Sequence, residues 1–433
     1  MRRLFLAALL MCVAACNGKA PPSGDSLDAI ARDYVQLSLT IGEKEEGYID
    51  AYYGPPELQA QAKAEAPRLN LEQLSQRTEQ LRSRAQAFED VGDDQMAQRR
   101  ARFLVAQLTA AATRLRMLRG EKLSFEDEAE GLFGVRPEVQ PLENFDSVIA
   151  SVEQLVPGEG PLSDRIEAFA NRFNIPKDRL KPVFDAAIAE CRRRTLQHIQ
   201  LPPNERFDLS FVTGKSWSGY NYYQGNAHSR IEINTDLPIR IPRAVDLGCH
   251  EGYPGHHVLN ALLEQKLVKD RGWVEFSVYP LYSPQSLLAE GSANYGILLA
   301  FPGNEQIEFE KRVIYPLAGL PVEQADAYTQ LQKALERLGA ARFTVAKQLL
   351  EGSIDEAEAA RLLQRYELAS AERAKKSVEF IKQYRSYVIN YGLGKDMVRA
   401  DVEAAGNDPA ARWKRMAQLL SEPTLPSDLK GGR

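Results

Sequence analysis

Helical spacing of apolar residues dominates this sequence, and strand-like patterns interrupt it in one region only. Near the N-terminus, Leu27, Ile30 and Tyr34 recur at the spacing of one helix face. Residues 207–212 instead alternate between apolar and polar, as a half-buried strand does, and residues 220–223 and 230–234 look like further strands. The sequence therefore predicts a mostly α (α+β) fold with one small sheet directly before a histidine-rich segment.

The chain has 433 residues, more than one ordinary hydrophobic core supports, so we expect two or three packed units. Stretches rich in Pro and Gly mark the predicted boundaries. The predicted regions are a flexible tether (16–25), an N-terminal helical region (26–140), a helical subdomain (141–205) and a catalytic region with the sheet, the histidine-rich segment and the C-terminal helices (206–433).

The first residues have the pattern of a secretory signal. Arg2 and Arg3 precede a short apolar run at residues 4–13, which ends in small residues before Cys16. The run is shorter than the roughly 17 apolar residues needed to span a bilayer. It resembles a bacterial lipoprotein signal, so we expect residues 1–15 to be removed and Cys16 to carry lipid, with plain secretion as the alternative. The mature protein would then be extracytoplasmic, lipid-anchored to a bacterial membrane and facing the periplasm.

Two cysteines remain for the folded part of the chain, Cys191 and Cys249. They could pair, but a chain of this size needs no disulfide framework. Cys249 precedes His250 directly and is a conceivable metal ligand. We expect it to be a small buried thiol beside the site.

Three of the five histidines lie within residues 250–257, next to Glu251. Zinc hydrolases commonly hold the metal with two histidines and a glutamate and leave one coordination position for water. A further glutamate takes the proton of that water. This concentration of ligand types predicts a Zn²⁺ site that includes His250.

The common zinc motif places its histidines four residues apart on one helix face, but Pro254 occupies that position here. Proline favours a break in the helix, and Gly255 allows a close backbone approach. A break would bring His256 to the place of the second ligand. His257 is the alternative, although on an unbroken helix it would lie roughly 10 Å from His250. The remaining interpretation is that the three histidines surround a helix break and bind no metal.

A third metal ligand is expected from another helix. Glu290 lies in an otherwise apolar, small-residue helix start, where a carboxylate is costly unless it meets a cation. A glutamate favoured by the helix dipole is the alternative. Glu275 is a second candidate, in a run where it could simply face solvent.

Other polar side chains could complete a site. Tyr387 or Tyr391 could donate a hydrogen bond to a developing oxyanion, and Arg385 or Lys395 could bind a substrate carboxylate. His228 could face the cleft, and the strand at residues 230–234 could bind a peptide backbone along its edge. Tyrosines at the edge of the core and a solvated histidine are the competing interpretations.

The octapeptide at residues 250–257 resembles the H-E-x-x-P-G-H-H signature of the bacterial family named domain of unknown function 885, grouped with gluzincin-type zinc peptidases. Residues 290–295 are similar to its later E-G-W-A-x-Y stretch, and residues 50–55 also fit. The resemblance implies a multi-helical gluzincin-like architecture, Glu290 as third zinc ligand and Glu251 as general base. The sequence departs from the family at Ser292, usually Trp, and at Ile297, where a second acid is common.

Several function classes have no support. A net charge of -5 and a pI near 5.8 do not indicate the excess of basic residues that is typical of nucleic-acid-binding proteins. The sequence also has neither a P-loop for nucleotides nor the G-x-S-x-G motif of serine hydrolases. We therefore expect a zinc-dependent hydrolase that cleaves peptides or peptide-like amides, with Glu251 activating a zinc-bound water. An esterase or deacylase would use the same chemistry. A non-catalytic metal- or peptide-binding lipoprotein derived from a peptidase is the alternative.

Overall fold

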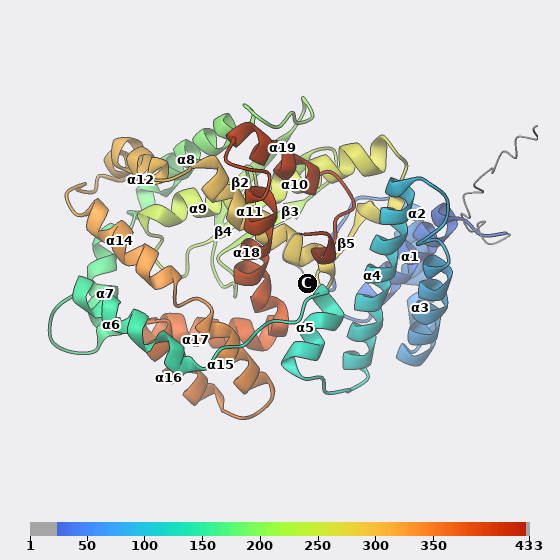
Figure 1. The fold of residues 1–433 in the computed structure, drawn as a ribbon, viewed down its shortest axis with the longest axis horizontal. Helices are drawn as coiled ribbons and strands as arrows, with labels where there is room; N and C mark the ends of the chain where they lie inside the picture. The colour runs from blue at the N-terminus through green and yellow to red at the C-terminus, as the bar shows by residue number, and fades with distance from the viewer. Residues whose placement is uncertain (1–23, 430–433) are drawn as a thin grey trace, which may run out of the picture.

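Helices build most of the molecule, which confirms the mostly α prediction (Figure 1). The structure is a computed structural model that describes residues 24–429. The predicted signal at residues 1–15 and the predicted lipid site at Cys16 lie outside the described residues. Within residues 24–429, no helix is both long enough and apolar enough to cross a membrane.

The N-terminal helices gather at one end of the elongated molecule, in blue on the right of Figure 1. Ser26 caps the first of them as its position predicts, because its side chain accepts a hydrogen bond from the Ala29 amide. These helices are α1 (Leu27–Gly42), α2 (Pro56–Glu65), α3 (Leu71–Gln86), α4 (Gln95–Leu118) and α5 (Phe125–Phe133).

The middle of the chain leads into the predicted sheet. Its helices are α6 (Asp146–Leu155), α7 (Leu162–Ala170) and α8 (Leu180–Thr195), and its strands are β2 (Arg206–Val212), β3 (Gly219–Tyr223) and β4 (His228–Asn234). The strand order is β2-β4-β3, with β2 parallel and β3 antiparallel to β4. β4 is therefore central, so the prediction that a peptide adds to residues 230–234 is wrong. β3 is one edge of these three strands, and Asn221 on it donates to the Glu251 carbonyl oxygen over 2.8 Å.

A second, two-stranded sheet was not predicted. β1 (Ile49–Tyr52) pairs antiparallel with β5 (Val278–Pro280). Each strand is too short to show a clear alternation, and the partners are more than 200 residues apart in sequence. This pair brings the stretch at residues 50–55 to the middle of the molecule.

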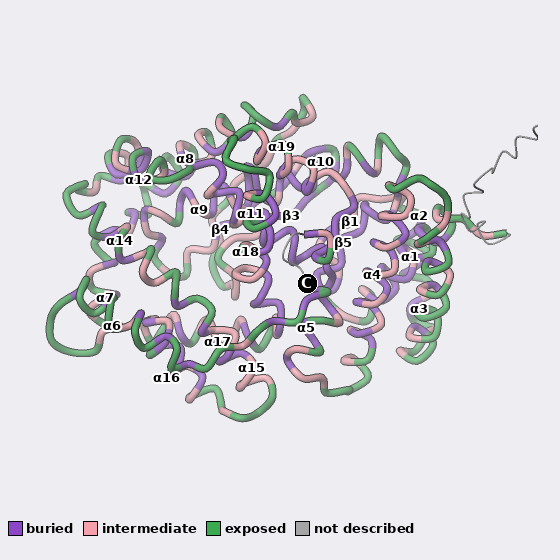
Figure 2. Tube along the Cα trace, in the orientation of Figure 1, coloured by how far each residue is buried: buried purple, intermediate pink, exposed green. Residues whose placement is uncertain are grey.

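The C-terminal half surrounds one buried helix, α11. All but two of its residues are buried, and Figure 2 shows it in purple at the centre. The helices after the sheet are α9 (Ile241–Glu251), α10 (His256–Leu263), α11 (Pro284–Ala300), α12 (Glu305–Phe309), α13 (Tyr315–Ala318), α14 (Ala325–Glu336), α15 (Ala341–Leu350), α16 (Glu356–Tyr366), α17 (Ala371–Tyr384), α18 (Ile389–Glu403) and α19 (Pro409–Leu419).

Two glycines allow α11 and α18 to touch. A Cβ on Gly291 would lie 2.4 Å from the carbonyl oxygen of Gly394, so a larger residue would push the helices apart. The contact matters because Glu290 precedes Gly291, while Tyr387 lies in the short helical turn just before α18 and Tyr391 lies in the first turn of α18.

The cysteine prediction is wrong. Cys191 of α8 and Cys249 of α9 form a disulfide, so Cys249 is neither a free thiol nor a metal ligand. The bond fastens the end of α9, which carries His250, to a neighbouring helix. Sequence could not decide this, because pairing requires α8 and α9 to lie side by side.

Candidate metal centre

The histidine-rich segment contains the predicted break. α9 ends at Glu251 and α10 begins at His256, with a cis peptide bond between Tyr253 and Pro254. The Gly255 amide donates to the Cys249 carbonyl oxygen over 3.1 Å. A Cβ on Gly255 would lie 1.7 Å from the His250 carbonyl oxygen, so only glycine fits there. The break folds the chain back and sets His256 against His250.

Three potential ligand atoms converge at this point. The Nε2 atoms of His250 and His256 are 3.1 Å apart, and Glu290 Oε2 lies 3.2 Å from the first and 3.8 Å from the second. A tetrahedral ion with bonds of about 2.1 Å holds its ligands about 3.4 Å apart. The three side chains therefore fit one zinc ion, and they form the only such cluster of His, Cys, Asp and Glu between residues 24 and 429.

Neighbours fix the orientation of these side chains. His250 Nδ1 lies 3.2 Å from Asn294 Oδ1, which can only accept, so Nδ1 carries a proton and Nε2 is the atom that faces the cluster. The Tyr387 hydroxyl donates to Glu290 Oε1 over 2.8 Å. Glu290 Oε2 is left buried without a hydrogen-bond partner and directed at the two imidazoles. A cation is the natural partner for such an atom.

The protonation states also suit a metal site. Burial lowers the pKa of His256 to about 4, so its imidazole is neutral near pH 7. Burial opposes ionisation of Glu290, but contact with His250 and electrostatic attraction to the two imidazoles hold the pKa of this carboxyl below its usual value. Glu290 is thus an anion beside a neutral imidazole, as zinc ligands need to be.

Glu251 points into the same cleft without binding a cation. Burial raises the pKa of its carboxyl to about 7, with the charge of Glu290 adding to the rise. Its Oε2 has no hydrogen-bond partner. A Cβ placed on Gly219 would lie 2.6 Å from Glu251 Oε1, so this carboxyl packs closely against β3. A carboxylate poised near neutral pH beside a candidate metal site has the properties of a general base.

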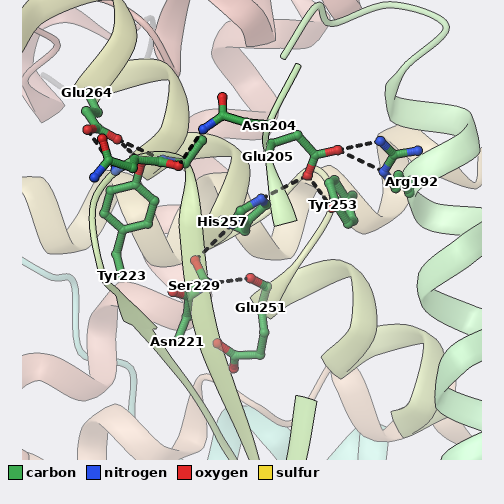
Figure 3. A network of polar contacts seen from close by, with 12 residues as sticks. Arg192, Asn204, Glu205, Asn221, Tyr223, Ser229, Glu251, Tyr253, His257 and Glu264 are labelled. Atoms are coloured by element: carbon green, nitrogen blue, oxygen red, sulfur yellow. Dashed lines mark hydrogen bonds and ion pairs between the residues drawn. The ribbon is translucent and has the colours of Figure 1, made fainter. Parts of the chain in front are cut away.

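His257 belongs to a different network, shown in Figure 3. Its Nδ1 lies 2.8 Å from Ser229 Oγ on β4 and its Nε2 lies 3.1 Å from Glu205 Oε2. Glu205 also accepts from Tyr253 and pairs with Arg192 of α8. His257 is fully buried and ties the sheet to the helix break, so the structure brings His256 rather than His257 to the cluster.

The cluster opens into a cleft of about 1810 Å³. Tyr387 and Tyr391 both line it, as do Glu251 and Lys395. The Tyr391 ring stacks near His250, with centroids 6.4 Å apart. Among residues 24–429 no hydrogen bond occupies the Tyr391 hydroxyl, whereas that of Tyr387 is bound to Glu290.

Three other predicted candidates have protein partners. His228 Nε2 pairs with Asp208 at 2.9 Å and does not line the cleft. Arg385 is also outside the cleft lining and binds the buried Glu128 at 2.7 Å. Lys395 lines the cleft but pairs with Glu336.

Glu275, the reserve metal ligand, does not face solvent. It is buried and bound to Arg100 through two hydrogen bonds of 2.5 and 3.0 Å. The pair lies with α4, apart from the three clustered ligands.

Sequence reasoning missed two cleft residues. Asp50 of β1 accepts a hydrogen bond from Tyr220 of β3, and both line the cleft. Burial raises the pKa of Asp50 to about 7, and the charge of Glu290 contributes. The only signal was the motif at residues 50–55, whose place in the fold depends on the unpredicted β1–β5 pair.

No protein-family model and no curated protein matches the sequence. Five chains of solved structures match it in fold. A candidate lipoprotein from Colwellia psychrerythraea is 15% identical, with 86% of this chain and 72% of that one covered and a TM-score of 0.49. A candidate lipoprotein of unknown function from Shewanella oneidensis is 12% identical, with 90% and 83% covered and a TM-score of 0.44.

The M32 carboxypeptidase from Deinococcus radiodurans R1 is 13% identical, with 90% of this chain and 89% of that one covered and a TM-score of 0.40. These likenesses are too distant to carry an argument about activity. The resemblance to the family of domain of unknown function 885 therefore rests on residues 250–257, 290–295 and 50–55 alone.

Replacing Gly255 with Ala should disrupt the centre. The new Cβ would overlap the His250 carbonyl oxygen, so the break must open and His256 must leave His250. We expect a loss of roughly 2–4 kcal/mol in the free energy of unfolding, measured by urea denaturation, and loss of stoichiometric zinc. The control is Gly248→Ala, whose Cβ would meet a side-chain carbon of Ile188 at 3.1 Å. Equal stability and zinc content in both variants would contradict the account of the break.

Proposed function

We propose that this protein is a zinc-dependent hydrolase that cleaves peptide or peptide-like amide bonds outside the cytoplasm, tethered by lipid on Cys16. One observation supports the chemistry above all. Two imidazole nitrogens and one carboxylate oxygen converge within 3.8 Å, and a free, buried glutamate lies in the same cleft. The location rests on the pattern of residues 1–16.

His250, His256 and Glu290 would hold the zinc. When bound, the metal supplies positive charge that acidifies water and stabilises an oxyanion. The protein's part is to keep three ligands in place with little freedom, through Asn294 behind His250 and Tyr387 behind Glu290.

Glu251 would act as general base and then as general acid. Its carboxylate accepts a proton from the attacking water and delivers it to the leaving amine, and a pKa of about 7 suits both steps. The Asn221 side chain donates to the Glu251 carbonyl oxygen over 2.8 Å and fixes the backbone of this residue against β3.

The two tyrosines would have different roles. Tyr391 lines the cleft beside His250, and within residues 24–429 its hydroxyl makes no hydrogen bond, so it is the better donor to the oxyanion. Tyr387 is a positioning residue, since its hydroxyl is bound to Glu290. The edge strand β3, whose residues Gly219 and Tyr220 line the cleft, would align the substrate backbone.

Replacing Glu251 with Gln should lower kcat on a cleavable peptide about 10²–10⁴-fold, because the amide cannot accept the proton. Zinc content, measured by atomic emission, should stay at that of the wild type. Glu356→Gln on the exposed start of α16 is the matched control and should change neither quantity. Full activity of Glu251→Gln would refute the proposal. Wild-type protein that holds zinc but cleaves nothing in a peptide mixture would favour the binding-lipoprotein alternative.

Replacing Tyr391 and replacing Tyr387 should affect different quantities, kcat in the first case and zinc affinity in the second. Tyr391→Phe should lower kcat by roughly tenfold or more at unchanged zinc affinity, because it removes only an oxyanion donor. Tyr387→Phe should weaken zinc binding about 10–100-fold, because Glu290 loses its orienting partner. Zinc titration against a chelator, together with steady-state kinetics at saturating zinc, separates the two effects. The roles would be wrong if both variants lowered zinc affinity equally.

A further inference from the structure

Most basic side chains that line the cleft are neutralised by an acid. Arg342 is bound to Glu367 through two contacts of 2.9 Å, and Lys395 pairs with Glu336. The start of α9 and α17 together form an arginine-rich wall of the cleft, and both approach Glu167 of α7. Arg240, Arg243 and Arg373 line the cleft there.

Arg240 and Arg373 share a single carboxylate. Arg240 Nη2 lies 2.6 Å from Glu167 Oε1, while Arg373 Nε lies 3.5 Å from Glu167 Oε2. The Nε atoms of both arginines are buried without a hydrogen-bond partner. The two terminal nitrogens of Arg373 have no acceptor within residues 24–429.

Two guanidinium groups, those of Arg240 and Arg373, therefore share one carboxylate, and the positive charge on this wall is only partly compensated. Burial lowers the pKa of Arg373, the charge of Arg240 lowers it further, and Glu167 does not offset the two. Lys376, one turn along α17, pairs with Asp236 at 3.4 Å and so leaves Glu167 to the two arginines. A half-buried guanidinium with free N–H groups is a binding site for a planar anion, above all a carboxylate.

Arg243 links this wall to the metal centre. It lies two helical turns before His250 on the same face of α9, about 10 Å along the axis. Its side chain is 47% exposed, and its nearest acid, Asp246, is 3.6 Å away. Its remaining donor contact is to Ser218 Oγ at 3.2 Å. The guanidinium is thus available to a molecule that extends along the cleft from the ligands.

We propose that Arg243 and Arg373, supported by Arg240, form a subsite for a carboxylate of the substrate, about three residues from the bond that is cleaved. The spacing follows because an extended peptide advances about 3.3 Å per residue, so three residues cover roughly 10 Å. The carboxylate is either the C-terminus of a short peptide or an Asp or Glu side chain. This inference rests on the proposed function, and it names the class of substrate: peptides with a negative charge at that position.

Binding without turnover tests the subsite first. The zinc-loaded Glu251→Gln protein is titrated by calorimetry with acetyl-trialanine and with acetyl-trialanine amide. We expect the free acid to bind at least about tenfold more tightly than the amide. Arg373→Gln in the same background should remove this preference, as should Arg243→Gln, which leaves the pair of Arg240 with Glu167 untouched. Arg361→Gln on α16, outside the cleft, is the matched control and should keep it.

A third peptide identifies the source of the carboxylate. Acetyl-Ala-Ala-Glu amide should match the acid if the subsite accepts a side chain, and should match the amide if it requires the C-terminus. Equal binding of acetyl-trialanine and its amide would overturn the proposal, as would a preference that survives in both Arg373→Gln and Arg243→Gln. Circular dichroism melting shows that each variant is folded.

Kinetics separate the failure of this inference from the failure of the proposed function. In otherwise wild-type protein, Arg373→Gln should raise KM for an acidic peptide about tenfold with kcat changed less than about threefold. Hydrolysis with no effect of Arg373→Gln would leave the hydrolase intact and refute the subsite. A carboxylate preference in binding without any hydrolysis would support the subsite and refute the hydrolase.

Discussion

The candidate metal centre depends on one close approach between two stretches of backbone. Gly255 passes so near the His250 carbonyl oxygen that a Cβ would lie 1.7 Å from it. In an ordinary zinc helix, two histidines share a face because four residues make about one turn. Here Pro254 prevents that, and the break between α9 and α10 achieves the same result for partners that are six positions apart. Without this approach, His256 would not meet His250, and Glu290 would face a single imidazole.

The surrounding structure keeps the break in one arrangement. On one side, the disulfide between Cys191 and Cys249 and the contacts of Glu205 with Arg192 and Tyr253 fasten it to α8. On another side, α11 and α18 meet at two glycines and present Glu290 with its tyrosine partners. Both ring nitrogens of the buried His257 contact protein groups that hold the break in place. A histidine inside the motif therefore need not be a metal ligand.

Sequence predicted what depends on local spacing. The break at Pro254 and Gly255, and Glu290 as an isolated acid in an apolar helix, both follow from neighbouring residues. The missed features join distant segments. Asp50 reaches the cleft through a strand pair, Cys249 is bonded across helices, and Arg385 is held by Glu128. Chain spacing carries no information about such contacts, so the sequence offered Arg385 as a free side chain although Glu128 binds it.

The central claim is that two imidazoles and one carboxylate hold zinc, with no sulfur ligand. Zinc K-edge X-ray absorption on the zinc-loaded protein tests it most directly. The account predicts two imidazole nitrogens and carboxylate or water oxygens at about 2.0–2.1 Å. A sulfur shell at about 2.3 Å, a third imidazole, or less than one zinc ion per chain after loading would contradict it.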